Sequence, residues 1–200
     1  MSVRQIKVGD QQNFVYLLVD DPSGEAIVID SGWEIEPIVT VVRAEKLDVK
    51  YAVATHHHSD HTATLWQLGR LFDAKIVAHK SSPTPHDLDM DDGDALRIGG
   101  LEVKILHTPG HTEDSICLYD GREVFTGDML FVGTIGKFDR ERAEAMYTSL
   151  HDVILRLPAS TVMYPGHDYG EVKFRTLGEE KASNPFLMTK DLRSFLSLFG

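Results

Sequence analysis

The sequence predicts an α/β protein in which two mixed β-sheets pack face to face and helices cover the outside. Three observations support this fold class. Strand-like apolar runs alternate with segments of helical spacing, each half of the chain contains a hairpin signal, and 42% of the 200 residues are hydrophobic. Two sheets with helices on their outer faces would bury that much apolar surface, and the length suits one domain over residues 1–200.

The first half begins with a predicted β-hairpin. Two β-rich runs, 14–19 and 26–30, flank the turn cluster Asp20-Asp21-Pro22-Ser23-Gly24. Pro37 then opens a helix, because its fixed φ suits the first helical turn. The remaining elements expected here are a buried strand at 51–55, a helix with Leu65, Leu68 and Phe72 on one side, and a strand at 75–78.

The second half predicts more strands and one long helix. Residues 79–93 hold two prolines and several aspartates, so we expect a loop there. Strands are expected at 101–107 and 161–164, and a hairpin at 115–119 and 123–126 around Asp120-Gly121. From about Arg140, apolar residues at helical spacing as far as Leu157 predict a long amphipathic helix.

Composition limits the classes of partner. The formal net charge of -11 disfavours nucleic acid, because binding a phosphate backbone requires a basic surface. The single cysteine, Cys117, permits no intramolecular disulfide and lies in an apolar run, where we expect it to be buried. The first residues do not resemble a signal peptide, and no apolar stretch is long enough to span a membrane. We therefore expect a cytoplasmic protein with a small-molecule substrate.

Four potential metal ligands occur within six positions: His56, His58, Asp60 and His61. They follow the predicted strand 51–55. Imidazole and carboxylate groups are costly to bury without a partner, and one metal site can use all of them. Imidazole with carboxylate suits zinc, iron or manganese, and the absence of cysteine ligands argues against a closed structural zinc site. The pattern therefore predicts a catalytic metal site.

Three further loops place a glycine before a ligand-type residue at the end of a predicted strand. They contribute His111 after Gly110, Asp128 after Gly127, and His167 after Gly166. Glycine allows the sharp turn that would bring each side chain to a shared sheet edge. With the first cluster this gives five histidines and two aspartates, the number that two adjacent metals need if one carboxylate bridges them.

On these residues the chain resembles the metallo-β-lactamase superfamily, which implies an αββα sandwich with a dinuclear site at one edge of the sheets. The resemblance implies that His56, His58 and His111 hold one metal and that Asp60, His61 and His167 hold the other. Asp128 would bridge them. Zinc is the expected metal, with iron or manganese as alternatives. The other histidines are expected to be structural or exposed, and His57 should point away from the site.

Within the superfamily, the segment Gly136-Lys137-Phe138 and the tyrosine of Gly166-His167-Asp168-Tyr169 resemble the glyoxalase II branch. The resemblance implies that Lys137 and Tyr169 contact the glutathione part of a thioester. Asp139 stands where that branch usually has tyrosine, and the branch's C-terminal helical domain is expected to be absent or reduced to 189–199. We therefore expect a less selective thioesterase, acting as a monomer or homodimer.

The expected reaction is attack of a metal-bridged hydroxide on the thioester carbonyl, with Asp60 and Asp128 as the catalytic carboxylates. An alternative remains open. The stretch 178–187 and the segment around Met146–His151 are similar to the persulfide dioxygenases, a mononuclear iron branch of the superfamily. That resemblance implies iron held by His56, His111 and Asp128, with oxidation of glutathione persulfide to sulfite.

Overall fold

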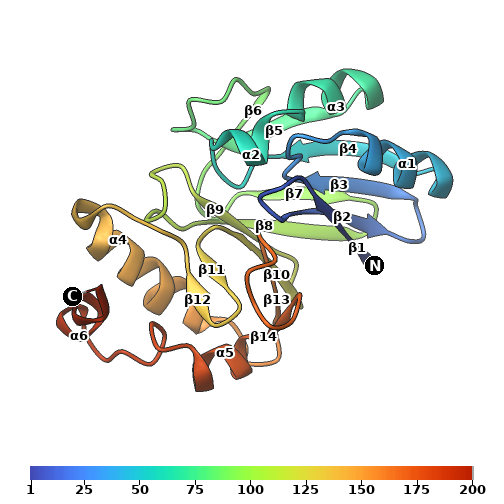
Figure 1. Cartoon of the computed structure of the whole chain (residues 1–200). Coiled ribbons are helices and arrows are strands. Elements are labelled where there is room, and N and C mark those ends of the chain that lie inside the picture. The colour runs from blue at the N-terminus through green and yellow to red at the C-terminus, as the bar shows by residue number, and fades with distance from the viewer. Residues whose placement is uncertain (200) are drawn as a thin grey trace.

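The computed structural model describes residues 1–199, which form two mixed sheets with helices on both outer faces (Figure 1). The predicted fold class is therefore confirmed. None of the helices within these residues is long and apolar enough to cross a membrane.

The first sheet has the strand order β1-β2-β3-β4-β5-β6. Its strands are β1 (Ser2–Val8), β2 (Asn13–Asp20), β3 (Glu25–Ile29), β4 (Asp48–Val53), β5 (Lys75–His79) and β6 (Leu88–Met90). The pairs β1–β2 and β2–β3 are antiparallel, so the predicted first hairpin is confirmed, and the pairs from β3 to β6 are parallel. The helices α1 (Glu36–Glu45) and α3 (Leu65–Phe72) cover its outer face (Figure 1).

The second sheet has the order β14-β13-β10-β9-β8-β7. Its strands are β7 (Ala95–Ile98), β8 (Leu101–His107), β9 (Ile116–Tyr119), β10 (Glu123–Gly127), β13 (Val162–Pro165) and β14 (Arg175–Thr176). Among these described strands, only β10 and β13 pair in parallel. A small separate hairpin consists of β11 (Leu130–Phe131) and β12 (Thr134–Ile135). The helices α4 (Ala143–Thr148), α5 (Leu177–Ser183) and α6 (Leu192–Leu196) contribute to the outer layer on this side.

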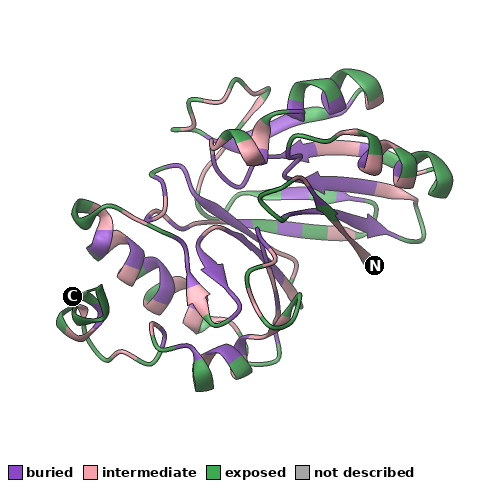
Figure 2. Ribbon diagram, viewed as in Figure 1, coloured by how far each residue is buried: buried purple, intermediate pink, exposed green. Residues whose placement is uncertain are grey.

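Alternating side chains on the strands separate the core into layers. On β2, Val15 and Leu17 pack in the cluster that includes α1 and α3, whereas Phe14 and Tyr16 pack in the cluster between the sheets. Because both faces are covered, β2 is buried along its whole length (Figure 2). A third cluster joins the second sheet to α4, α5 and α6. The ends of several buried strands meet at one edge of this sandwich, where the loops carrying the predicted ligands lie.

Two expectations from the sequence are wrong in part. Residues 79–93 are not all loop, because β6 extends the first sheet by pairing Val77 with Leu88. The long helix from Arg140 is broken into a 3-10 turn (Arg140–Arg142), α4, a π-helical turn (Ser149–Val153) and another 3-10 turn (Ile154–Arg156). Its apolar face is nevertheless buried or half-buried, and it ends before Pro158, which disfavours helical geometry in the preceding residue.

Candidate metal centre

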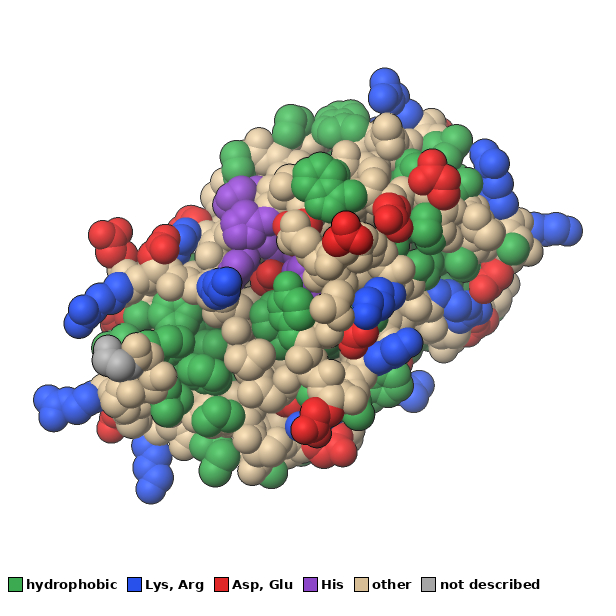
Figure 3. All heavy atoms as spheres, in the orientation of Figure 1, with side chains coloured by type: hydrophobic (Ala, Val, Ile, Leu, Met, Phe, Trp, Pro, Cys, Tyr) green, Lys and Arg blue, Asp and Glu red, His purple; other side chains and the backbone are tan. Residues whose placement is uncertain are grey.

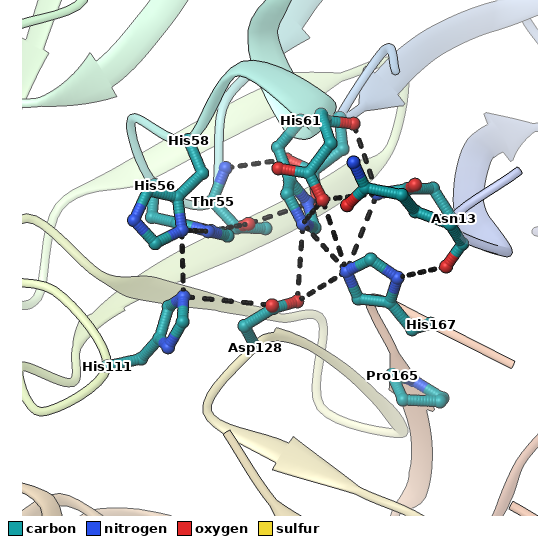
Figure 4. Close-up of polar contacts among 12 residues, drawn as sticks. Asn13, Thr55, His56, His58, His61, His111, Asp128, Pro165 and His167 are labelled. Carbon is teal, nitrogen blue, oxygen red and sulfur yellow. Dashed lines mark hydrogen bonds and ion pairs between the residues drawn. The ribbon is translucent and has the colours of Figure 1, made fainter. Parts of the chain in front are cut away.

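All seven predicted ligand residues come together at the edge of the sandwich (Figure 4). His56 and His58 lie in the loop after β4, and Asp60 and His61 lie in the short helix α2 (Ser59–Thr62) that follows. His111 comes from the loop between β8 and β9. Asp128 directly follows β10 and His167 lies two residues after β13, and these strands are the two parallel neighbours of the second sheet.

Three histidines form the first part of the cluster. The Nδ1 atom of His58 lies 3.0 Å from Nε2 of His56 and 2.9 Å from Nε2 of His111. One ligand nitrogen from each of these three residues lies within 4.8 Å of the other two. Such a spacing places three imidazole nitrogens around one point, which suits a zinc-sized cation.

The second part contains Asp60, His61 and His167, whose ligand atoms also lie within 4.8 Å of one another. The two Nε2 atoms of the histidines are 3.2 Å apart, and each lies 3.5 Å from Oδ2 of Asp60. Asp128 lies between the two parts. Its Oδ1 is 3.3 Å from Nε2 of both His61 and His167, and its Oδ2 is 3.7 Å from Nε2 of His111.

Hydrogen bonds on the outer side of the rings fix which nitrogen faces the cluster. Nδ1 of His61 lies 2.8 Å from a carboxylate oxygen of Asp30. Nδ1 of His167 lies 2.9 Å from the carbonyl oxygen of Gln11, and Nδ1 of His111 lies 2.6 Å from that of Lys137. These oxygens only accept, so each Nδ1 donates, and the lone pair of a neutral ring is on the inward Nε2.

Lone pairs and carboxylates that converge in this way repel one another unless a cation lies between them. The buried Oδ1 of Asp128 accepts no hydrogen bond from any residue within 1–199, although two imidazole nitrogens lie close to it. A metal ion would satisfy this oxygen and the inward nitrogens together. The donor set of imidazole nitrogens and carboxylate oxygens therefore fits one or two divalent metals.

Electrostatics at the site agrees with this donor set. Burial holds the pKa of His56 well below its usual value, so its ring is neutral and able to act as a ligand. For Asp128, burial favours the neutral acid, but His61 and His167 outweigh it and hold the carboxyl pKa well below its usual range. For His61, burial opposes the charged form, whereas Asp30 and Asp128 raise its pKa well above normal. A proton on His61 and a metal ion would therefore compete to neutralise the same carboxylates.

Two important polar residues were not identified from the sequence. Asp30 is buried at the end of β3 and accepts hydrogen bonds from the Thr55 amide (2.8 Å), the Thr55 hydroxyl (3.0 Å) and His61. Asn13 donates from Nδ2 to the carbonyl and the Oδ2 of Asp60, both at 3.1 Å. Asp30 shares the pattern of the predicted ligands, a polar residue ending an apolar strand, and this signal could have drawn attention to it.

The glycine that precedes a ligand has a clear role at Asp128. Gly127 has φ +48°, a conformation that disfavours other residues. A Cβ atom there would also lie 2.5 Å from the Thr55 hydroxyl oxygen. That oxygen lies 3.1 Å from Nδ1 of His56. The sharp turn that carries Asp128 into the site thus depends on glycine for both conformation and space.

A cavity of about 460 Å³ opens beside the cluster, and both predicted substrate-binding residues line it. Lys137 is exposed, and the Tyr169 ring stacks on His167 with centroids 4.7 Å apart and planes at 8°. Figure 3 shows the histidines gathered at a hollow in the surface, with hydrophobic side chains nearby. The further lining residues include Gln11, Phe131, Thr134 and Ile135.

The remaining histidines lie outside the cluster, as expected. Nδ1 of His57 pairs with Asp114 at 2.6 Å, which turns this ring away from the ligand atoms. His79 and His107 stack on each other with centroids 4.0 Å apart. His151 stacks on Tyr147 in the α4 region and lies 3.2 Å from the Thr189 hydroxyl.

A sandwich of two mixed sheets with a histidine and aspartate cluster at its edge defines a class of metal-binding enzymes, and sequence comparison identifies the family. Residues 8–167 match the model of the metallo-beta-lactamase superfamily. The chain belongs to this superfamily.

Relatives within the superfamily have two different activities in their names. A probable hydroxyacylglutathione hydrolase of Schizosaccharomyces pombe is 31% identical, over 92% of this chain and 86% of the relative. The human mitochondrial persulfide dioxygenase ETHE1 is 34% identical, over 94% of this chain and 76% of the relative. The crystal structure of ETHE1 from Myxococcus xanthus superposes with a TM-score of 0.92 at 32% identity, covering 99% of this chain and 89% of that one.

Proposed function

We propose that the protein is a dinuclear metal-dependent hydrolase of the glyoxalase II type that cleaves a glutathione thioester such as S-lactoylglutathione. The observation that carries this proposal is that two groups of three ligand-type side chains come together and that Asp128 lies between them. A relative named as a probable hydroxyacylglutathione hydrolase supports the same reaction.

In this proposal His56, His58 and His111 hold one metal, and Asp60, His61 and His167 hold the second. Asp128 would be a ligand of both. Zinc is the proposed metal, and iron or manganese also suit these ligands. When bound, two such ions supply Lewis acidity and lower the pKa of a shared water towards neutrality.

The side chains around the cluster have separate tasks. Asp60 would orient the attacking water, because it lines the cavity and its Oδ2 is held by Asn13 Nδ2 at 3.1 Å. Lys137 forms no ion pair with any carboxylate within residues 1–199, so its charge is free to bind an anionic thiol carrier. Tyr169 would contact the same part of the substrate.

A nucleophilic side chain is not needed for this reaction. The Cys117 thiol is fully buried in the core, and burial raises its pKa to about 12. It also lies outside the set of residues that line the cavity. Water, positioned by the cluster, is the nucleophile that the arrangement favours.

A second candidate is a persulfide dioxygenase with one iron held by His56, His111 and Asp128. The observation that favours it is the structural likeness to ETHE1, which extends over nearly the whole chain at a TM-score of 0.92. Two histidines and one carboxylate on one side of a metal leave positions open for oxygen and a sulfur substrate. Oxidation of glutathione persulfide to sulfite is the corresponding reaction.

Metal analysis combined with two assays separates the candidates. Protein purified without added metal is analysed for zinc, iron and manganese, then assayed with S-lactoylglutathione and, for oxygen uptake, with glutathione persulfide. Two metals per chain and thioester hydrolysis support the first proposal. One iron with persulfide-dependent oxygen uptake, and retention of turnover in Asp60→Ala and His167→Ala, would replace it with the second.

A further inference from the structure

The C-terminal segment 177–187, comprising α5 and the turn after it, contains two polar side chains that are completely buried. Glu180 and Asn184 both have 0% exposure. A carboxylate and an amide are costly to bury unless hydrogen bonds replace their contacts with water. Their partners therefore indicate what this segment holds in place.

Both side chains bind the tip of the β11–β12 hairpin. The amide of Gly133 donates to the two carboxylate oxygens of Glu180 at 3.1 and 3.0 Å. Nδ2 of Asn184 donates to the Thr134 carbonyl at 3.2 Å and to Glu180 Oε2 at 2.9 Å. Arg175 balances the buried charge, with Nη1 3.3 Å from Glu180 Oε1. The hairpin tip is thus tied to α5 by a connected polar network.

The hairpin depends on such support because it is very short. Each strand has two residues, and an isolated two-stranded hairpin is only marginally stable. Its base is held by the Thr126 hydroxyl, which donates to the Leu130 carbonyl at 2.7 Å. The network from α5 fixes the opposite end, at the Val132–Gly133 turn.

This hairpin forms one wall of the cavity beside the metal cluster. Phe131, Thr134 and Ile135 line the cavity, and Lys137 follows two residues after β12. The same segment reaches the cluster itself, since the Lys137 carbonyl accepts a hydrogen bond from Nδ1 of His111. A displacement of the tip would therefore shift the cavity wall relative to the ligands.

We infer that Glu180 and Asn184 are positioning residues. Through them, α5 fixes the position of the β11–β12 hairpin as a wall of the cavity, and this position determines the affinity for substrate. This inference rests on the proposed function in one respect, that the cavity is the substrate site. Neither side chain lines the cavity, so each acts through the hairpin. A purely structural role for the network would stabilise the fold without affecting the wall.

The test compares Glu180→Ala, Glu180→Gln and Asn184→Ala with a control on the same helix, Glu179→Ala. Glu179 is exposed and caps α5 by accepting from the Thr176 amide and hydroxyl, so its replacement loosens the helix without touching the hairpin. Glu180→Gln keeps an oxygen for the Gly133 amide. If Glu180→Ala fails to fold, Glu180→Gln is a variant on which KM and amide exchange can still be measured.

We expect Glu180→Ala and Asn184→Ala to raise KM about tenfold, with kcat changed by less than about threefold, because each removes a buried hydrogen bond to the wall. Amide exchange of residues 133–136 in the metal-bound protein should accelerate about tenfold or more. Glu180→Gln should recover most of both effects. The control should leave KM and this exchange unchanged, even where it lowers the melting temperature.

The inference is overturned if the amide exchange rates of residues 133–136 are unchanged in Glu180→Ala or Asn184→Ala. It is also overturned if the control raises KM as much as these variants do. Exchange is measured without substrate, so it decides the positioning role even if S-lactoylglutathione is not hydrolysed. In that case the proposed function fails by itself. If persulfide is the substrate that turns over, KM is measured with it instead.

Discussion

Asp30→Asn is expected to weaken metal binding without changing any of the seven candidate ligands. Oδ2 of Asp30 accepts from the Thr55 hydroxyl at 3.0 Å and from Nδ1 of His61 at 2.8 Å. Oδ1 accepts from the Thr55 amide at 2.8 Å. Asparagine has nearly the same shape and, like aspartate, tolerates the positive φ of +57° found here. The substitution therefore tests the hydrogen bonds and charge rather than the backbone.

The size of the effect follows from these contacts. If the amide oxygen keeps the bond to the Thr55 amide, the amide NH₂ group takes the place of Oδ2 and faces the donor on His61. Hydrogen bonds to a charged group each contribute about 1.5–3 kcal/mol, and the Thr55 hydroxyl can rotate to accept, so a loss of about 2–3 kcal/mol in unfolding free energy is expected. A neutral His61 ring relieves the remaining donor–donor contact by carrying its proton on Nε2, which faces the cluster, instead of on Nδ1. Metal affinity should then fall about 10–100-fold.

Two measurements check this prediction. Urea unfolding of the metal-free protein gives the stability change, and competition with a chelator of known zinc affinity gives the change in metal binding. Asp73→Asn is the matched control, since Asp73 has nearly the same φ of +54° but is exposed at the end of α3. Zinc affinity in Asp30→Asn equal to that of the control would show that the Asp30–His61 contact does not orient the ligand.

Three further outcomes are expected. Lys137→Ala should raise KM for a glutathione thioester about tenfold and leave an uncharged thioester unaffected, because only the anionic substrate loses a charge contact; equal effects on both substrates would contradict this role. Cys117 should resist a thiol-specific reagent at pH 8 in the folded protein and react fully in denaturant, since the thiol is buried and its pKa is about 12; fast labelling of the native chain would contradict the packing. Chelation should lower the melting temperature, and zinc at about 1,000 times its Kd should restore roughly 4 kcal/mol of stability; a melting temperature insensitive to chelator would argue against metal binding at the cluster.

Much of the site could be predicted from the sequence because its ligands are chemically distinctive. Histidines crowded with an aspartate at the end of an apolar strand have few structural explanations, and the glycines before His111, Asp128 and His167 marked the other loops. The structure brings all seven residues together. The strand ends also had to meet, since β10 and β13 are parallel neighbours in one sheet.

The parts that were missed depend on contacts between distant residues. Asp30 at the end of a strand gives no local indication that it binds His61, 31 positions later. Glu180 in a helical segment likewise gives no indication that Gly133 is its partner. The strand β6 has only three residues, too few for a periodic pattern, and the helix from Arg140 keeps its apolar face while its backbone departs from α-helical geometry. In each case packing determines the structure more than local sequence does.

The candidate metal ligands and the cavity wall are held by different parts of the chain, which bears on the choice between hydrolysis and oxidation. The ligands sit on loops that directly follow core strands, and buried groups such as Asp30 fix the direction of their rings. Phe131 and Thr134 sit on a short peripheral hairpin that depends on Glu180 and Asn184 in the C-terminal segment. Changes in the hairpin or in α5 can thus alter the substrate while the ligand cluster stays in place. The stretch 178–187, in which the sequence suggested a likeness to persulfide dioxygenases, is the segment that supports this wall, so under the proposed positioning role it would affect substrate selection more directly than the histidine cluster does.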